Sequence, residues 1–476
     1  MDGTIKQVFA TMIVGQVLVA MGVNCALHSI TLIQVPQDED RFMDDDQLNW
    51  TIAVTALALM VGSCLAMPIA PVLGARRLLV LTQPIYALAS LSAGFGKHLG
   101  WVLLGRILTN ISIGMSEGTA RSYVSEIVPP NKRTLYTAIL NTMVFASQAI
   151  FTILGRYAHW RIMFLIAGFF PAVVCLAGLY FIPNSPKWLL SHGHSEEEAR
   201  RAIHFFHGKE ADADAEIRST KDSLRETHVD GVSIPMRKLI LRRDTLQPLL
   251  LVTGQMVIFI WSGGNGINFI LPLILKHVNL PLDQYQSAML PMALSASLCV
   301  PTSVVIERFG RLPLLCGSGA ISAAGCAAIV TFFFLPEAQQ QTSGSLVLVG
   351  SVIVHLTFAC VIAPIALTYV NELLPNRTRI FCANITMGMV YTDLFILLKT
   401  FPLLSGSIGL GGIFVINGVV SLVQVAFATF FLPETKDLSL EQIQQMFQSA
   451  NKVSGESSDV DKGLGVKPDE ESLALE

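Results

Sequence analysis

Residues 123–133 read YVSEIVPPNKR, and residues 369–379 read YVNELLPNRTR. Tyr, Val, Glu, Pro and Arg stand at the same offsets in the two stretches. Each stretch follows a long apolar run and ends on a basic residue. The pattern therefore marks equivalent helix ends in two related units.

Two further pairs of segments repeat in the same order. GARR at residues 74–77 corresponds to GR at 310–311, and PNSPK at 183–187 corresponds to PETK at 433–436. Any one match alone is weak evidence. Three matches, in order and at nearly the same shift, predict two repeated halves.

The composition is typical of a membrane protein. Hydrophobic residues make up 52% of the 476-residue chain and charged residues only 14%, against about 25% charged in soluble domains. The charges fall in short clusters between apolar runs of about 20 residues, which span about 30 Å of hydrocarbon as helices. A net charge of −3 offers no basic surface for nucleic acid. The eight cysteines lie in apolar runs without metal-type spacing, so we expect neither a disulfide framework nor a metal site.

Twelve membrane-spanning helices are expected, six in each half. The predicted fold class is an all-α membrane protein with two pseudo-symmetric six-helix bundles. The expected domains are an N-terminal bundle (1–182), a cytoplasmic linker with short amphipathic helices (183–245), a C-terminal bundle (246–432) and a mostly disordered cytoplasmic tail (433–476). The expected spans are 8–33, 50–73, 78–96, 100–126, 134–157, 160–182, 247–275, 284–306, 312–334, 345–372, 380–405 and 409–432. The first is too long for the apolar region of a signal peptide, so we expect it to be retained.

The basic residues between the spans predict the orientation. Arg and Lys gather in one set of loops, at 76–77, 132–133, 308–311 and 377–379, whereas the opposite loops carry few. The positive-inside rule therefore predicts that both termini and the linker are cytoplasmic. We expect a multi-pass protein of the plasma membrane, with the lipid bilayer as its surroundings.

A glutamate stands seven residues before an arginine at the same helix end in both halves. The positive-inside rule explains the arginines but not the glutamates. The pattern favours a cytoplasmic gate, in which helix-end carboxylates pair with arginines of neighbouring loops when the inner mouth is closed. The expected gating residues are Arg76, Arg77, Glu126, Arg133, Glu307, Arg308, Arg311, Glu372 and Arg379.

These helix-end segments, with Gly105-Arg106 at the start of the fourth span, resemble the sugar porter family of the major facilitator superfamily over essentially the whole chain. PNSPKWLL at 183–190 is similar to the family's PESPRWL, ERFGR at 307–311 is similar to its DRxGR, and PETK at 433–436 matches its PETK. KTF at 399–401 and the short tail resemble the insect facilitated trehalose transporter branch. The resemblance implies two bundles that rock about a midplane site, and movement of a sugar down its gradient.

The resemblance also implies where substrate binds, and there the chain departs from the family. The family's QQLSGIN in the seventh span corresponds to FIWSGGN at 259–265, so both glutamines are replaced by apolar residues. The expected substrate-binding residues are Asn141, Ser262, Asn265, Asn268, Ser295 and Tyr391. They still supply hydrogen-bonding groups and an aromatic ring, although for Asn268 and Ser295 a role in joining helices is an equally good interpretation. The losses predict a site poorer in donors, and hence a different or less polar substrate, or weak sugar transport.

Three charges lie within the spans, at Glu117, Arg121 and Asp393. Glu117 and Arg121 are four residues apart, so they share one face of the fourth helix and can neutralise each other. The alternative is that Arg121 binds an anionic substrate group or latches the gate. Asp393 is a candidate proton carrier, but the first span has Asn24 and His28 where proton-coupled sugar porters often carry Asp. This favours uncoupled transport.

The leading hypothesis is facilitative transport of a sugar, trehalose or hexose-like, by alternating access. One alternative is a carrier of another solute, such as an organic anion bound by Arg121. A second is a non-transporting nutrient sensor on the same fold, which the short tail disfavours. An enzyme is not expected, because no nucleophile–base pair, metal cluster or phosphate loop occurs at a plausible spacing. We expect no cofactor and no nucleic-acid partner, and the sequence leaves the oligomeric state open.

Overall fold

The computed structural model describes residues 3–38, 42–129, 132–208, 213–228, 243–275, 278, 280, 282–375, 378–436, 438, 442–443 and 446–447. All regular secondary structure in these residues is helical. The predicted disordered tail beyond residue 447 and linker residues 229–242 lie outside the described residues.

The first half contains the six predicted spans. The first consists of α1 (Gly3–Val14) and α2 (Gln16–Gln34), which run on as one apolar segment. The others are α3 (Asp45–Leu73), α4 (Ala75–Phe95), α5 (Leu99–Ile127), α6 (Arg133–Leu154) and α7 (Trp160–Leu179). The second span begins at Asp45 rather than at the expected residue 50, because Asp44 and Gln47 form a reciprocal capping box around an acidic first turn.

The second half contains the other six spans. They are α12 (Arg243–Trp261) with α13 (Gly264–Leu275), α14 (Gln284–Phe309), α15 (Arg311–Phe334), α17 (Ser345–Thr357) joined to α18 (Ala363–Glu372) by a π-helical turn η3 (Phe358–Ile362), and α19 (Arg379–Phe431). Helix α19 carries two spans and is interrupted at Gly409, whose φ is 71°. Ten of the described helices are long and apolar enough to cross a membrane. The second span of α19 and the broken seventh span complete the twelve.

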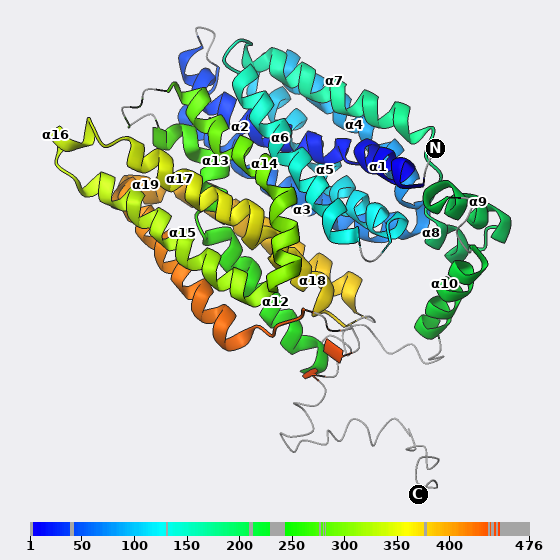
Figure 1. Cartoon of the computed structure of the whole chain (residues 1–476). Coiled ribbons are helices and arrows are strands. Elements are labelled where there is room, and N and C mark those ends of the chain that lie inside the picture. Colours follow the sequence, from blue (N-terminus) through cyan, green and yellow to red (C-terminus); the bar gives the residue numbers. More distant parts are fainter. Residues whose placement is uncertain are drawn as a thin grey trace, which may run out of the picture.

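Between the two halves, the residues that the structure describes form three short helices. They are α8 (Pro186–Ser191), α9 (Glu196–His207) and α10 (Ala213–His228). Helix α9 is capped by Ser195, whose side chain accepts a hydrogen bond from the backbone N–H of Glu198 and which is followed by three acidic residues. In Figure 1 these helices lie together at one end of the molecule, which we call the linker end. The opposite end is called the far end.

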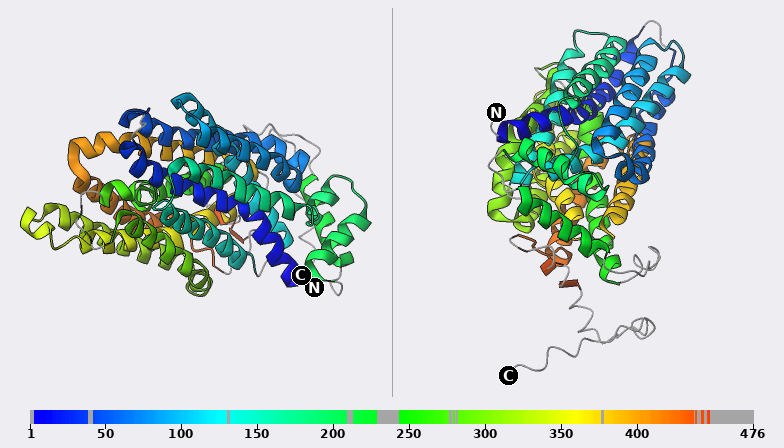
Figure 2. Two further views of the ribbon diagram at one scale, coloured as in Figure 1. Left: turned by 90° about the horizontal axis from the view of Figure 1, so that it is seen from above. Right: turned by 90° about the vertical axis from the view of Figure 1, so that its right-hand side faces the viewer.

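The two halves lie side by side (Figures 1 and 2). Their hydrophobic cores merge at the far end but not at the linker end. At the far end one hydrophobic cluster includes residues of both halves, among them Trp160 and Phe401. Towards the linker end the cores are separate. One cluster around Tyr123 belongs to the first half, and another around Tyr369 belongs to the second. The halves are thus packed together at the far end and have independent cores at the linker end.

Candidate substrate site and helix-end contacts

Polar side chains from α5 and α6 meet in the middle of the first half. The Arg121 Nε donates to Glu117 Oε1 at 3.3 Å, as their spacing predicted. The Arg121 Nη1 donates to Asn141 Oδ1 at 3.0 Å. Side-chain exposure is only 24% for Arg121 and 14% for Glu117, so the ion pair is largely desolvated. Glu117 and Asn141 thus hold the arginine from two helices.

Tyr391 extends this group across the interface between the halves. It lies on the first span of α19, and its hydroxyl donates to Glu117 Oε2 at 3.1 Å. Tyr391 also packs against a hydrophobic cluster of the first half that includes Leu59 and Ile113. We call Glu117, Arg121, Asn141 and Tyr391 the central cluster. The structure therefore brings two of the predicted substrate-binding residues together with two of the predicted intramembrane charges.

A second polar bridge lies on the same helix as Asn141. The Gln148 Nε2 donates to Asn268 Oδ1 at 2.8 Å and to the Asn268 carbonyl at 3.3 Å, which joins α6 to α13. Asn268 was among the expected substrate-binding residues, whereas Gln148 was not. A signal was available, because Gln148 lies seven residues, about two helical turns, after Asn141 and so shares its face.

The seventh span breaks where the predicted substrate residues lie. Helix α12 ends at Trp261, and Gly263 has a φ of 92°, a left-handed conformation that favours glycine. At the break, the Ser262 hydroxyl and the Asn265 amide both donate to the Phe259 carbonyl, at 3.0 and 3.4 Å. These bonds satisfy a backbone acceptor that the interrupted helix leaves free.

Asp393 also contacts this break. The Trp261 Nε1 donates to Asp393 Oδ1 at 3.0 Å, while Asp393 Oδ2 is buried and has no partner among the described residues. The carboxylate thus ties the break in α12–α13 to the first span of α19.

Ser295 lies apart from the central cluster. Its hydroxyl is fully buried inside the second half, donates to the Pro291 carbonyl at 2.9 Å and lies 2.9 Å from His355 Nδ1. Phe145 of α6 packs edge-on against the His355 ring, with centroids 5.5 Å apart. These contacts fit the interpretation in which Ser295 joins helices.

Arg106 is a buried charge with an unusual surrounding. Only 1% of it is exposed, and its Nη2 donates to Thr31 Oγ1 at 3.0 Å. Its guanidinium lies 5.0 Å from the centre of the Phe164 ring. Within the described part of the chain no carboxylate pairs with it. Asn24, in the first span, donates from its Nδ2 to Asn110 Oδ1 at 2.8 Å.

At the linker end of the second half, two of the expected gating residues pair with each other inside one half. The Arg311 Nη2 donates to Glu372 Oε1 at 2.9 Å, and both side chains are about one-fifth exposed, at 20% and 19%. Glu434, of the PETK segment, accepts from the backbone N–H groups of Arg311 and Leu312, at 3.2 and 2.9 Å. Lys436 donates to the Arg308 carbonyl at 2.9 Å. The segment after the last span therefore caps the start of α15.

The corresponding residues of the first half make other contacts. The Arg76 Nε donates to the Leu179 carbonyl at 2.9 Å, and Arg77 lies 5.8 Å from the Trp188 ring centre. Glu126 accepts from Ser122 at 3.4 Å, and Arg133 donates to the Ser125 carbonyl at 3.1 Å. In the part of this half that the structure describes, Glu126 has no arginine partner.

Three expected gating residues remain. Glu307 and Arg308 are exposed at the end of α14. Arg379 begins α19, but its side chain lies outside the described residues.

Direct contacts between the halves gather at the far end and around the middle of the molecule. At the far end Arg156 pairs with Asp283 at 2.6 Å, and Gln34 donates to the Tyr285 hydroxyl at 3.3 Å. Lys399 lies 3.5 Å from Asp46 and 3.9 Å from the Trp50 ring centre. No hydrogen bond or ion pair between described residues joins the halves at the linker end. The interface is therefore closed at the far end.

Comparisons with known proteins agree with this arrangement. The family model described as sugar (and other) transporter matches residues 30–447. The facilitated trehalose transporter Tret1 of Polypedilum vanderplanki is 27% identical over 403 residues, 84% of this chain and 79% of that protein. Tret1 of Aedes aegypti is 25% identical over 92% of this chain, which spans only 55% of that relative. The solved structure of the proton:xylose symporter XylE bound to 6-bromo-6-deoxy-D-glucose superposes with a TM-score of 0.74 at 19% identity, over 93% of this chain and 99% of that one, and shares the fold.

Proposed function

Because the chain belongs to the sugar (and other) transporter family, we propose that it carries a neutral sugar across the membrane by alternating access. The substrate class is a disaccharide such as trehalose, or a hexose. The names of the curated relatives, facilitated trehalose transporters from several insects, support this class.

The observation that carries the proposal is the Tyr391–Glu117 bond within the central cluster. A carrier needs a polar site near the bilayer midplane that both halves contact and that can be rearranged when they rock. Glu117 belongs to the first half and Tyr391 to the second, and their oxygen atoms are 3.1 Å apart. A sugar hydroxyl that replaces this bond would exchange one hydrogen bond for another, which keeps the buried carboxylate satisfied.

The charge balance of the cluster favours a neutral solute over an organic anion. The Arg121 guanidinium already faces the Glu117 carboxylate at 3.3 Å and the Asn141 oxygen at 3.0 Å. An incoming carboxylate or phosphate would meet Glu117 as a like charge in a largely desolvated place. A polyol instead can donate to Glu117 and accept from Arg121 at the same time.

The remaining expected site residues complete the proposed site around this cluster. Asn268 and Gln148 form the second bridge between the halves, and Asn265 opens α13 beside the break in the seventh span. We include Asn141, Asn265, Asn268 and Tyr391 in the substrate site. Ser262 and Ser295, both fully buried and bonded to their own helices, are assigned to supporting contacts.

The closed far end and the separate cores at the linker end correspond to one of the two access states. With the linker in the cytoplasm, as the basic loops predict, this state is open to the inside. The Arg311–Glu372 pair then holds α15 to α18 within the second half. We propose that Glu126 acquires an arginine partner in the opposite state, when the linker ends of the halves meet.

Transport is proposed to be uncoupled from protons. The first span offers Asn24 and His28 in place of a carboxylate, and Arg106 has no acidic partner in the described residues. A proton carrier would need an acid that is exposed in both access states in turn. We place the carrier in the plasma membrane with both termini cytoplasmic.

The proposal is tested by uptake into proteoliposomes that contain the purified full-length chain. Radiolabelled trehalose, glucose and an organic anion such as succinate are compared, each with and without an imposed proton gradient. We expect saturable uptake of one of the sugars, no response to the gradient and no uptake of succinate. Tyr391→Phe and Asn268→Ala are expected to lower kcat/KM about tenfold, the effect of losing one hydrogen bond to a charged or bridging group.

Asn371→Ala is the matched control. Asn371 is exposed on α18, and among the described residues its side chain donates only to the carbonyl of Leu367 on its own helix, so uptake should be unchanged. Succinate uptake that requires Arg121 would favour the organic-anion alternative. Sugar binding without uptake, measured by calorimetry on the same sample, would favour a sensor.

A further inference from the structure

The two halves differ at one repeated position near the linker end. In the second half, the carboxylate of Glu434 accepts hydrogen bonds from four backbone N–H groups, those of Arg311, Leu312, Thr435 and Lys436. The sequence repeat places Asn184 at the corresponding position of the first half. The charge is therefore present in one half and missing from the other.

The structure supports this correspondence independently of the sequence. The hydroxyl of Tyr123 donates to the Pro183 carbonyl at 2.6 Å, and that of Tyr369 donates to the Pro433 carbonyl at 3.2 Å. The same pair of residues thus anchors the segment after the sixth and after the twelfth span. Asn184, however, does not act as Glu434 does, because its Oδ1 is buried without a partner among the described residues.

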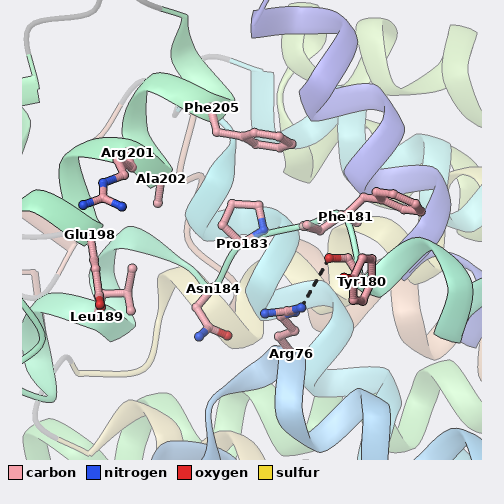
Figure 3. A pocket seen from close by; sticks show the side chains of 11 residues that line it. Arg76, Tyr180, Phe181, Pro183, Asn184, Leu189, Glu198, Arg201, Ala202 and Phe205 are labelled. Carbon is pink, nitrogen blue, oxygen red and sulfur yellow. Dashed lines mark hydrogen bonds between the residues drawn. The ribbon is translucent and has the colours of Figure 1, made fainter.

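A cavity of about 450 Å³ lies beside Asn184. Figure 3 shows it between the start of α4, the segment after α7, and α9. Two cations reach it from different elements, Arg76 from α4 and Arg201 from α9. Among the described residues that line it, Glu198 is the one acid, and its carboxylate lies 2.9 Å from His194 Nδ1.

The arginines retain donors for a ligand. Arg76 uses two N–H groups on the carbonyls of Leu179 and Tyr180, at 2.9 and 3.5 Å, of the five that a guanidinium has. Arg201 lies 3.7 Å from Glu197, and 74% of its side chain is exposed. A tetrahedral anion in the cavity would accept charge-assisted hydrogen bonds from guanidinium groups that line it, and such bonds are the strongest available to it.

The surroundings of the cavity point to the membrane surface. Tyr180 and Phe181 line it at the end of the sixth span and are 79% and 65% exposed. Exposed aromatic residues at the end of a span are typical of the level of lipid headgroups. A volume of this size accommodates a phosphate with its glycerol or other small substituent.

We propose that this cavity binds the phosphate of an anionic phospholipid, which supplies to the first half the negative charge that Glu434 supplies to the second. The bound headgroup joins α4, the segment after α7, and α9, so it fastens the linker helices to the first half. The cavity shares no lining residue with the central cluster, so the proposal does not depend on which solute is carried.

The test measures lipid retention by the purified full-length chain in detergent, using native mass spectrometry and thermal unfolding. Phosphatidic acid, phosphatidylcholine and inorganic phosphate are added separately. We expect phosphatidic acid to remain bound and to raise Tm, whereas phosphatidylcholine and millimolar inorganic phosphate should not. Arg201→Gln should weaken retention about tenfold, the effect of one charge-assisted contact.

Asn184→Glu is the decisive variant, because it restores the internal carboxylate. It should abolish retention of phosphatidic acid and its effect on Tm. Asn184→Gln keeps the site neutral and should retain the lipid, and Arg218→Gln, on exposed α10 outside the cavity, is the matched control for charge. Equal retention by wild type, Asn184→Glu and Arg201→Gln would overturn the proposal. A response to inorganic phosphate as large as that to phosphatidic acid would overturn the assignment to lipid.

Discussion

At the scale of single residues, Arg121 depends on its neighbours for neutralisation. Glu117 lies 3.3 Å away on the same helix, and Asn141 lies 3.0 Å away on the next. Removing one member of a desolvated pair leaves the other charge without compensation, whereas removing both is much less costly. The ion pair is therefore expected to behave as a unit rather than as two separate contributions.

A double-mutant cycle tests whether Glu117 and Arg121 stabilise the protein as a coupled pair. Glu117→Gln and Arg121→Gln should each lower the free energy of unfolding in detergent by about 1–3 kcal/mol, because the pair is only partly exposed. The double variant should be more stable than either single variant. The measurement is Tm and denaturant unfolding of all four proteins, and additive losses in the double variant would show that the two charges do not interact.

The sequence allowed some of the residue contacts to be predicted and not others. The Glu117–Arg121 pair follows from the four-residue spacing on one helix, which is a local property. The bonds from Tyr391 to Glu117 and from Gln148 to Asn268 join residues 274 and 120 positions apart. Hydrogen bonds between such distant residues depend on the packing of α19 against α3 and of α6 against α14. No local sequence pattern specifies that packing.

At the scale of elements, the break in the seventh span is held by a glycine with a positive φ. A β-carbon at Gly263 would be strained by the φ of 92° and would lie 3.2 Å from Asn417. Gly263→Ala should therefore lower stability by about 1–2 kcal/mol and reduce transport, because α13 would be reoriented. Gly317→Ala is the control, since α15 leaves open space there and the same change should be neutral or stabilising. Equal effects of the two substitutions on Tm and uptake would contradict the prediction.

The contact between the tail segment and α15 is expected to stabilise the protein to a degree that depends on pH, because it requires the ionised carboxylate of Glu434. Burial alone would raise the pKa of Glu434, but four backbone N–H donors hold it below its ordinary value of 4.5. A carboxyl with a pKa lower in the folded than in the unfolded state adds stability that is present above the unfolded pKa. That stability is lost as the pH falls below about 4.5 towards the folded pKa.

The measurement is Tm of wild type and Glu434→Gln between pH 7 and pH 3.5. The variant should be less stable at pH 7, and the difference from wild type should shrink at the acidic end. A constant difference across the range would show that Glu434 acts through its shape rather than its charge.

Helix positions were predicted better than helix ends. Apolar runs of about 20 residues identify spans because the hydrocarbon thickness demands them. The start of α3 was placed late because its first turn is acidic and polar and is stabilised by a capping box. The boundary between the last two spans was expected at residues 405–409, which agrees with the interruption of α19 at Gly409.

At the scale of the whole molecule, the duplicated helix ends were enough to predict two six-helix halves. They were not enough to predict at which end of the molecule the two halves contact each other. Both states are built from the same sequence and differ by the contacts between the halves. Glu126 has no arginine partner in the described residues, whereas the Arg311–Glu372 pair is formed, and we propose that this difference belongs to the state open at the linker end.

The far-end contacts predict how the balance between states can be shifted. Arg156–Asp283 and Lys399–Asp46 join the halves only where the far end is closed, and each is partly exposed. Such pairs contribute about 0.2–1 kcal/mol each, so Arg156→Ala with Lys399→Gln should move the equilibrium a few-fold towards the state closed at the linker end.

The measurement is the rate at which an impermeant maleimide labels Ser122→Cys from the linker side, with exposed Cys64 replaced by Ser. We expect slower labelling in the double variant, and recovery when Arg156→Asp is combined with Asp283→Arg to rebuild the pair in reverse. Unchanged labelling in both backgrounds would mean that the shared hydrophobic core, rather than these ion pairs, holds the far end closed.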